Sequence, residues 1–240
     1  MSLAESTYPE PNLEVICRNG ALTAAVSPPV PREASALQGI FQNRRSIRRL
    51  QDGPFTPEMQ QRVLEAVRLT PAAYNLPPWR VVLVREQRAD TWRQIEAAFR
   101  DHLSGERLER NLARLAGFRS GVGLALIFED LRVGRALREE KGASADLATQ
   151  FVQQALGMVQ LSLWLALTAE GLATSLQHWE EFLVDRTEQL TGLPAADFQL
   201  AAAMPIGYAA EEPRDIARPA TTQVCTVDPG AHGLPHPDVV

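Results

Sequence analysis

A basic pentapeptide holds the densest group of ligand-binding side chains in this sequence. Residues 44–48 place three guanidinium groups and one hydroxyl within five positions, on Arg44, Arg45, Ser46 and Arg48. Arginine forks and a serine hydroxyl are the donors that a phosphate or a polyol chain needs. A solvated basic patch that binds nothing has the same composition, so this segment alone leaves both interpretations open.

A second candidate is the proline-rich segment over residues 70–80, which reads Thr-Pro-Ala-Ala-Tyr-Asn-Leu-Pro-Pro-Trp-Arg. Its prolines stiffen the chain, and the amide of Asn75 offers both a donor and an acceptor. A rigid loop of this kind can present polar groups to the edge of a flat ring. The alternative is a plain turn in which Trp79 anchors the core.

Two further segments lie later in the chain. Residues 171–179 begin with small side chains that permit close backbone approach to a ligand, and they include His178, which could donate a proton near pH 7. A hydrogen-bonded structural histidine is the competing interpretation. Residues 204–208 are followed by Arg214 and Arg218, and an arginine shortly after a strand can supply a second phosphate contact.

Composition and missing motifs exclude several functional classes. The chain has 240 residues and a net charge of −5, which argues against general affinity for nucleic acid or an anionic membrane. No dinucleotide-binding glycine fingerprint, Walker A loop, serine-nucleophile elbow or zinc-spaced cysteine and histidine cluster occurs in it. His232 and His236 stand in a tail broken by proline and glycine, so no metal site is expected. Cys17 and Cys225 are interpreted as reduced thiols of a cytoplasmic protein without a signal peptide.

The elements that must position these segments follow from periodicity. We expect an extended N-terminal arm over residues 1–36, one organised domain over 37–218 and a C-terminal tail over 219–240. Helices are predicted from Thr56, as the cap, to Pro71, then over 89–114, 147–170 and 182–191; strands are predicted over 80–84, 123–128 and 198–206. Strands alternating with helices indicate an α+β or α/β domain with helices over a mixed sheet.

The helix over residues 147–170 carries no charge between Leu147 and Ala169 and is long enough to cross a bilayer. Its four glutamines and three hydroxyl side chains are too polar for a lone lipid-facing helix. We therefore expect a helix buried on most sides, inside the fold or at a subunit interface, and closed by Gly171.

In this order and spacing, the segments resemble the nitroreductase family. The pattern runs from residue 41 to 218: RRSIR, a helix, TPAAYNLPPWRVVLV, a long buried helix ending in Gly-Leu, and a last strand ending in PIGY. Residues 121–130 (GVGLALIFED) and 171–179 (GLATSLQHW) are similar to the subgroup that contains fungal Frm2-type nitroreductases and related bacterial oxidoreductases.

The resemblance implies an α+β sandwich, a mixed and mostly antiparallel sheet covered by helices, in an intertwined homodimer with FMN at the interface. In similar proteins the arginine-serine-arginine segment holds the phosphate and ribityl chain, which points to Arg44, Arg45, Ser46 and Arg48. The late arginine, here Arg218, also reaches the phosphate. The partner chain supplies the ring-facing loop, here Ala72, Ala73, Tyr74 and Asn75. Backbone groups of Leu176, Gln177 and His178 lie near the flavin N5.

Some positions depart from the commoner family pattern. The partner-loop hydroxyls are replaced by Ala72 and Ala73, a frequently polar position is Pro77, and the usual lysine before the late arginine is Ile216. Each lost neutral hydrogen bond weakens binding by roughly 0.5–1.5 kcal/mol.

By this resemblance the protein oxidises NADH or NADPH and reduces a nitroaromatic, a quinone or a similar small acceptor in a ping-pong cycle. The chemistry is flavin-centred, with no catalytic side chain and no metal. A flavin-binding protein for storage or regulation is the alternative, and dehalogenation or flavin fragmentation is a second enzymatic one.

Overall fold

The computed structural model describes residues 32–85 and 88–225, and within them the core is one five-stranded sheet. The strands are β1 (Leu50–Gln51), β2 (Trp79–Val84), β3 (Gly123–Asp130), β4 (Ala173–Thr174) and β5 (Phe198–Ala209). Their order is β1-β5-β3-β2, and β4 also pairs with β5. All four ladders are antiparallel, while Ser46 and Thr174 form a parallel bridge beside them.

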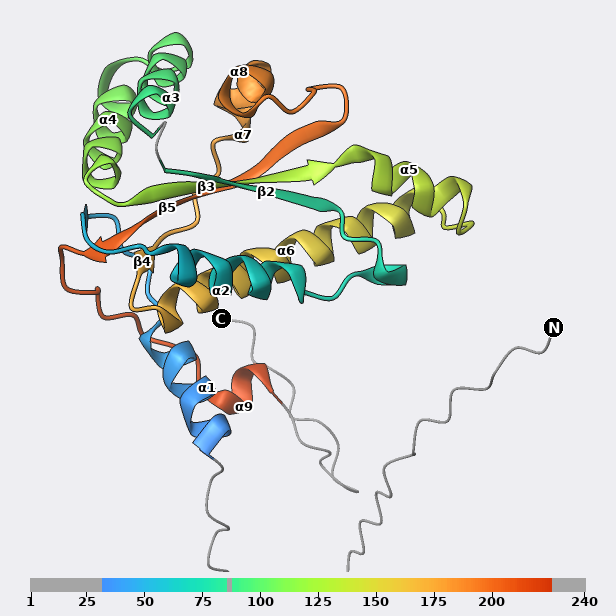
Figure 1. Cartoon of the computed structure of the whole chain (residues 1–240), viewed down its shortest axis with the longest axis horizontal. Helices are drawn as coiled ribbons and strands as arrows, with labels where there is room; N and C mark the ends of the chain where they lie inside the picture. The colour runs from blue at the N-terminus through green and yellow to red at the C-terminus, as the bar shows by residue number, and fades with distance from the viewer. Residues whose placement is uncertain (1–31, 86–87, 226–240) are drawn as a thin grey trace, which may run out of the picture.

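Helices cover both faces of the sheet (Figure 1). One face carries α2 (Pro57–Arg68) and α6 (Ala145–Ala169), and the other carries α3 (Arg88–His102), α4 (Gly105–Arg119), α7 (Glu180–Leu183) and α8 (Thr187–Thr191). The remaining elements are α1 (Arg32–Asn43), α5 (Leu131–Glu139), α9 (Thr221–Val224) and the 3-10 turns η1 (Ala73–Asn75) and η2 (Val184–Arg186). The predicted α+β sandwich with a mostly antiparallel sheet is confirmed.

The central strand β3 is buried on both faces, which explains its wholly apolar run. Leu124, Leu126 and Phe128 pack in the cluster under α3, α4 and α7, while Ala125 and Ile127 pack in the cluster under α2 and α6. This alternation is the two-residue period of a strand. A strand covered by helices on both sides has no face that must be polar.

A bulge in β5 changes which of its side chains face each layer. Ile127 pairs with Ala202 but Phe128 pairs with Leu200, so Ala201 is an extra residue in β5. As a result Leu200 and Ala203 lie in the same core cluster, although their numbers differ in parity. The bulge keeps apolar residues inward on both sides of the irregularity.

The predicted helix signals at the start of α2 and the end of α6 are confirmed. The hydroxyl of Thr56 accepts a hydrogen bond from the N–H of Met59 at 3.3 Å, and Pro57 takes the first helical position. At the other site Gly171 adopts φ +75°, and the N–H of Leu172 donates to the carbonyl of Leu167 at 2.9 Å. The Thr56 cap fixes where α2 begins, and the turn at Gly171 directs the chain into β4.

Two predicted helices are divided in the structure. The helix expected over residues 89–114 is α3 and α4, separated at Ser104, because Gly105 takes φ +53°, a conformation that no helix interior can continue. The helix expected over 182–191 consists of α7, η2 and α8. Tertiary packing decides this, since Phe182, Leu183 and Leu190 all enter the cluster under α3 and α4.

The chain ends lie partly outside the described residues. Helix α1 begins at Arg32, inside the segment predicted as an extended arm, and α9 falls within the predicted tail. Cys17, His232 and His236 lie outside the described residues. Cys225 has an exposed, free thiol.

Helix α6 is only partly buried within the single chain. It is long and apolar enough to cross a membrane by length and composition, yet only 33% of its most apolar stretch is buried inside the chain. Its solvent-facing stripe, here called the α6 stripe, contains Leu147, Gln150, Gln154, Met158 and Leu161. Their spacing of three or four residues places them on one helix face. Burial inside the fold therefore holds only for the opposite face of α6, and burial of the α6 stripe at a subunit interface stays a prediction.

Candidate functional site

The basic pentapeptide lies at the edge of the sheet, held there by its one apolar residue. Ile47 is buried in the core, and its N–H donates to the carbonyl of Thr174 at 3.1 Å. The neighbouring bridge between Ser46 and Thr174 keeps the segment extended. In an extended segment alternate side chains share a side, so Arg44, Ser46 and Arg48 face away from the core that takes Ile47.

Arg44 stands in a cluster of positive charge. Its guanidinium carbon lies 4.5 Å from the centroid of the Trp164 ring of α6. Burial lowers the pKa of Arg44, and the charges of Arg218 and Arg45 lower it further. The Arg45 guanidinium donates to the carbonyl of Gln42 at 2.6 Å. Within residues 32–85 and 88–225 no carboxylate forms an ion pair with these three arginines.

Three guanidinium groups that repel one another, one of them partly desolvated, are stabilised by a bound anion. A phosphate offers several acceptor oxygens and two negative charges, which suit converging arginine forks. In the structure the charges of Arg45 and Arg218 lie near enough to Arg44 to lower its pKa, and their shared role in holding a phosphate stays a prediction. The structure adds Trp164, which sequence reasoning missed because a tryptophan in an apolar helix is typical of core packing.

The loop after β4 runs along the edge of β5 that faces away from β3. Gln177 pairs with Ala203 through two backbone hydrogen bonds of 2.8 and 2.9 Å. In an extended segment the backbone groups of successive residues point to opposite sides. The N–H groups of Leu176 and His178 accordingly point away from β5, and neither has a backbone acceptor in the described part of the chain. They remain available as donors to a ligand.

Small polar side chains lie at the base of this loop. Thr174 and Ser175 are buried, and the Thr174 hydroxyl has no hydrogen-bond partner among the described residues. The side-chain amide of Gln177 donates to the Ser175 hydroxyl at 3.0 Å. A buried hydroxyl without a partner is uncommon in native proteins and marks a place where a polar ligand or water is expected.

His178 is exposed rather than buried in the core. Its Nδ1 lies 3.5 Å from Oε1 of Glu180. Both side chains line a cavity of about 330 Å³ together with Glu129 of β3. Burial raises the pKa of the Glu129 carboxyl.

The proline-rich loop lies far from the arginine cluster within one chain. Tyr74 and Asn75 both adopt φ 55°, an uncommon conformation for residues other than glycine. The Tyr74 ring packs edge-on against Phe151 with centroids 6.2 Å apart. Phe151 precedes Trp164 by thirteen residues of α6, which is about 20 Å along a helix. Ala72, Ala73, Tyr74 and Asn75 therefore do not meet Arg44 inside a single chain.

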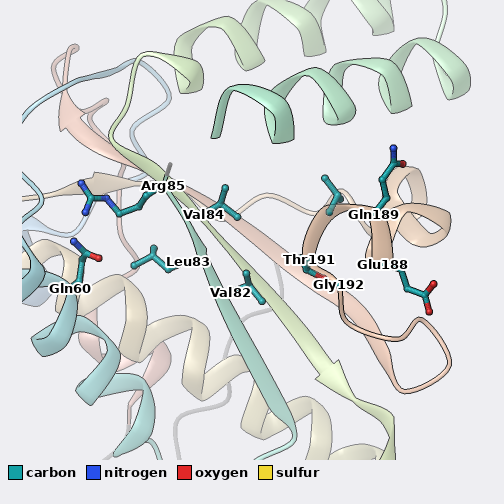
Figure 2. A pocket seen from close by; sticks show the side chains of 10 residues that line it. Gln60, Val82, Leu83, Val84, Arg85, Glu188, Gln189, Thr191 and Gly192 are labelled. Carbon is teal, nitrogen blue, oxygen red and sulfur yellow. The ribbon is translucent and has the colours of Figure 1, made fainter. Parts of the chain in front are cut away.

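A cavity of about 710 Å³ lies elsewhere, along the outer edge of β2 (Figure 2). Val82 to Arg85 form one wall, Gln60 of α2 lies at one end, and Glu188 to Gly192 of α8 and its following turn lie opposite. None of the site residues predicted from the sequence lines it. Volume alone thus does not locate the chemistry in this molecule.

Comparison with protein families matches residues 41–208 to the model described as the nitroreductase family. The chain belongs to the nitroreductase family. The match begins just before the basic pentapeptide and ends at the last residue of the PIGY segment. It therefore includes every site segment named above, but neither Arg214 nor Arg218.

Among curated relatives, this nitroreductase is similar to HBN1 of Saccharomyces cerevisiae, with 28% identity over 127 residues. That alignment covers 52% of this chain and 63% of the yeast protein, so the chain spans less than two thirds of this relative's length. The narrower prediction of a Frm2-type subgroup stays a prediction.

Solved nitroreductases share the fold. The structure of CinD from Lactococcus lactis in complex with 4-nitrophenol has a TM-score of 0.69 and 24% identity, covering 79% of this chain and 98% of CinD. FMN-dependent NfnB from Mycobacterium smegmatis, in complex with NADPH, has a TM-score of 0.62 and 17% identity, covering 81% and 99%. At these identities the similarity establishes the fold.

Proposed function

We propose that this nitroreductase is an FMN-dependent NAD(P)H oxidoreductase that reduces small electron-poor acceptors such as nitroaromatics or quinones. The observation that carries the proposal is the cluster of Arg44, Arg45 and Arg218, which lacks a carboxylate partner among the described residues. FMN-bound relatives of the same fold, such as a nitroreductase from Desulfitobacterium hafniense at 16% identity, support the choice of anion.

The described residues offer hydrogen-bond donors for both ends of FMN, the phosphate and the ring. Arg44, Arg45, Ser46 and Arg218 would hold the phosphate and the ribityl chain, with Trp164 supporting the guanidinium of Arg44. Arg48 and the free N–H groups of Leu176 and His178 would face the ring.

The second half of the site is proposed to come from a partner copy of this chain. Ala72, Ala73, Tyr74 and Asn75 lie about 20 Å along α6 from Trp164, too far to reach the same flavin. The α6 stripe exposes Leu147, Met158 and Leu161, which a second chain would bury. A homodimer in which each loop serves the partner's flavin accounts for both observations.

FMN, when bound, accepts a hydride from a nicotinamide and passes the electrons to an acceptor. The protein's part is to bind, orient and stabilise charge. The N–H donors of Leu176 and His178 would orient the edge of the ring, and the nearby arginines would stabilise negative charge on it. No side chain is assigned as nucleophile or general base. Donor and acceptor would bind beside the Leu176–His178 loop in turn, so we expect ping-pong kinetics.

A visible absorption spectrum of the purified protein tests the cofactor first. Oxidised-flavin peaks that persist through desalting support the proposal. NADH or NADPH oxidation in the presence of a nitroaromatic or a quinone then tests the activity. Protein that neither retains FMN nor oxidises NAD(P)H after FMN addition would overturn it. Fractionation of the native cell tests the accompanying proposal that the protein is cytoplasmic.

A flavin-binding protein with little turnover is the second candidate. It is favoured by Ala72 and Ala73, which offer the ring no side-chain hydrogen bond. Stopped-flow mixing of the flavin-loaded protein with NADH separates the two, since an enzyme bleaches the flavin absorbance quickly and a storage protein does not. Dehalogenation and flavin fragmentation are tested by supplying halogenated substrate or reduced flavin with oxygen.

A further inference from the structure

A basic cavity of about 420 Å³ lies between α4 and the loop after β4. Helix α4 contributes Arg107, Arg110, Asn111 and Arg114 to it. These positions follow the spacing i, i+3, i+4 and i+7, so they form one face of the helix. Leu115 and Phe118 hold α4 in the core, which fixes the direction in which this face points.

The charges around this cavity are unbalanced. Arg107 is neutralised by Glu181, with 3.0 Å between the guanidinium nitrogen and the carboxylate oxygen. Arg119, nearer the end of the same helix, is paired with Glu96. Arg48, Arg110 and Arg114 have no ion pair anywhere in the described part of the chain. The unpaired arginines of α4 are therefore the two that line the cavity.

Two like charges four residues apart destabilise a helix, and neither Arg110 nor Arg114 has an ion pair among the described residues to offset this. An anion between the guanidinium groups would remove the repulsion and give each fork an acceptor. The cavity is of a size that takes one aromatic acid or one phosphorylated sugar, and it is too small for a whole dinucleotide.

The opposite wall of the cavity is the loop over Leu176, Gln177 and His178. This is the loop proposed above to face the flavin ring, so a molecule stacked there would extend toward α4. Arg48 connects the two regions, since it belongs to the basic pentapeptide and also lines the cavity.

We propose that Arg110 and Arg114 bind an anionic group, carboxylate or phosphate, on the molecule that exchanges electrons at the Leu176–His178 loop. The inference rests on the proposed function and assigns a role to α4, which gave no functional signal in the sequence. Two sources supply such a group: the phosphates of the nicotinamide donor and a carboxylate on the acceptor.

Steady-state kinetics of the flavin-loaded dimer distinguish these sources. The double variant R110Q/R114Q is compared with the wild type using NADH and NADPH, and using 4-nitrobenzoate and its neutral methyl ester. Loss of two charge-assisted bonds should lower kcat/KM for the anionic partner by about tenfold or more. A loss confined to NADPH identifies a donor phosphate. A loss confined to 4-nitrobenzoate identifies an acceptor carboxylate.

The control is R93Q on α3, which removes one arginine charge at an exposed position outside the cavity. An equal change of kcat/KM in R93Q and in the double variant would overturn the proposal. An equal change of kcat/KM for charged and neutral substrates would also overturn it. Circular dichroism of each variant verifies folding.

A binding measurement separates this proposal from the proposed function. Calorimetric titration of 4-nitrobenzoate and of 2′,5′-ADP into the protein, without turnover, reports the anion site directly. Binding by the wild type that weakens about tenfold in R110Q/R114Q supports the site even if NAD(P)H oxidation is absent. Binding of neither probe by the wild type, or equal binding by both proteins, overturns it.

Discussion

The guanidinium carbon of Arg44 lies 4.5 Å from the ring centroid of Trp164, which joins the sheet-edge pentapeptide to the C-terminal part of α6. The Trp164 ring contacts the Arg44 guanidinium from above its plane. The N–H donors at the edge of the guanidinium therefore stay free for a ligand. Arg44 also lies near Arg45 and Arg218. Burial is the main cause that lowers the pKa of Arg44, and the charges of these two arginines lower it further. This arrangement supports the proposal that these arginines hold a phosphate.

Replacing Arg44 tests the phosphate site. Arg44→Gln should weaken FMN binding by roughly 10- to 100-fold, because a hydrogen bond to a charged group contributes about 1.5–3 kcal/mol. Quenching of flavin fluorescence during titration of the protein gives the dissociation constant. Arg49→Gln is the control, since Arg49 is an exposed arginine in the same run but outside the predicted set. Equal weakening in both variants would contradict the assignment.

A charge on the α6 stripe tests the dimer. The wild type should behave as twice the chain mass of 26.4 kDa in size-exclusion chromatography with light scattering. Leu161→Glu should give a monomer that retains FMN at least about tenfold less well, because the partner loop is lost. Val184→Glu is the control, because it places the same charge at a similarly exposed position in the helical layer on the other face of the sheet. A monomeric wild type that keeps FMN tightly would rule out the shared site.

Glu129 should lower stability as pH rises. Burial raises its pKa above the unfolded value, so the folded state resists ionisation. Below the pKa of the unfolded state, the carboxyl is protonated in both states and costs no stability. Between that pKa and the raised pKa of the folded state, the free energy of unfolding falls as pH rises, and it stays lower at pH 7. Glu129→Gln should therefore raise the urea midpoint at pH 7 and leave it unchanged near pH 3.5. A lower midpoint at pH 7 would refute this sign.

Glu170 should have the opposite effect from Glu129, because its ionised carboxylate should stabilise the fold at pH 7. Its carboxylate accepts two bonds from Arg62, of 2.6 and 2.7 Å, and these lower its pKa although burial opposes them. The stabilisation is present above the unfolded pKa and is lost as pH falls through the depressed one. Glu170→Gln should lower the urea midpoint at pH 7, with a smaller effect near pH 3. Glu65→Gln, which breaks an exposed pair within α2, should matter less.

Gly121 is expected to tolerate no side chain. A Cβ at this position would lie 2.3 Å from the carbonyl oxygen of Ile206 in β5. Gly121→Ala should cost about 1–3 kcal/mol of unfolding free energy, because the backbone of β3 or β5 must shift. Gly39→Ala in α1 is the control, with no atom within 4 Å of its added carbon and a gain in helix propensity. Urea denaturation of both variants compares the two, and equal stability would contradict the close contact.

The sequence alone determined features that depend on neighbouring residues. The apolar run of β3, the Thr56 cap and the Gly171 ending follow from local periodicity and capping, and the structure confirms them. The basic pentapeptide was visible for the same reason, because its charges are adjacent in the chain. The family pattern followed from the order of the segments.

Tertiary structure decided what depends on distant residues. The Ala201 bulge, the break at Gly105 and the left-handed Tyr74 respond to packing that no local pattern encodes. Trp164 under Arg44, and the unpaired Arg110 and Arg114 beside the Leu176–His178 loop, join segments over fifty residues apart. The sequence gives the charge of each side chain, but the fold decides whether a charged side chain has an oppositely charged neighbour. In this protein, the presence or absence of such a neighbour distinguishes ion-paired arginines from candidate binding groups.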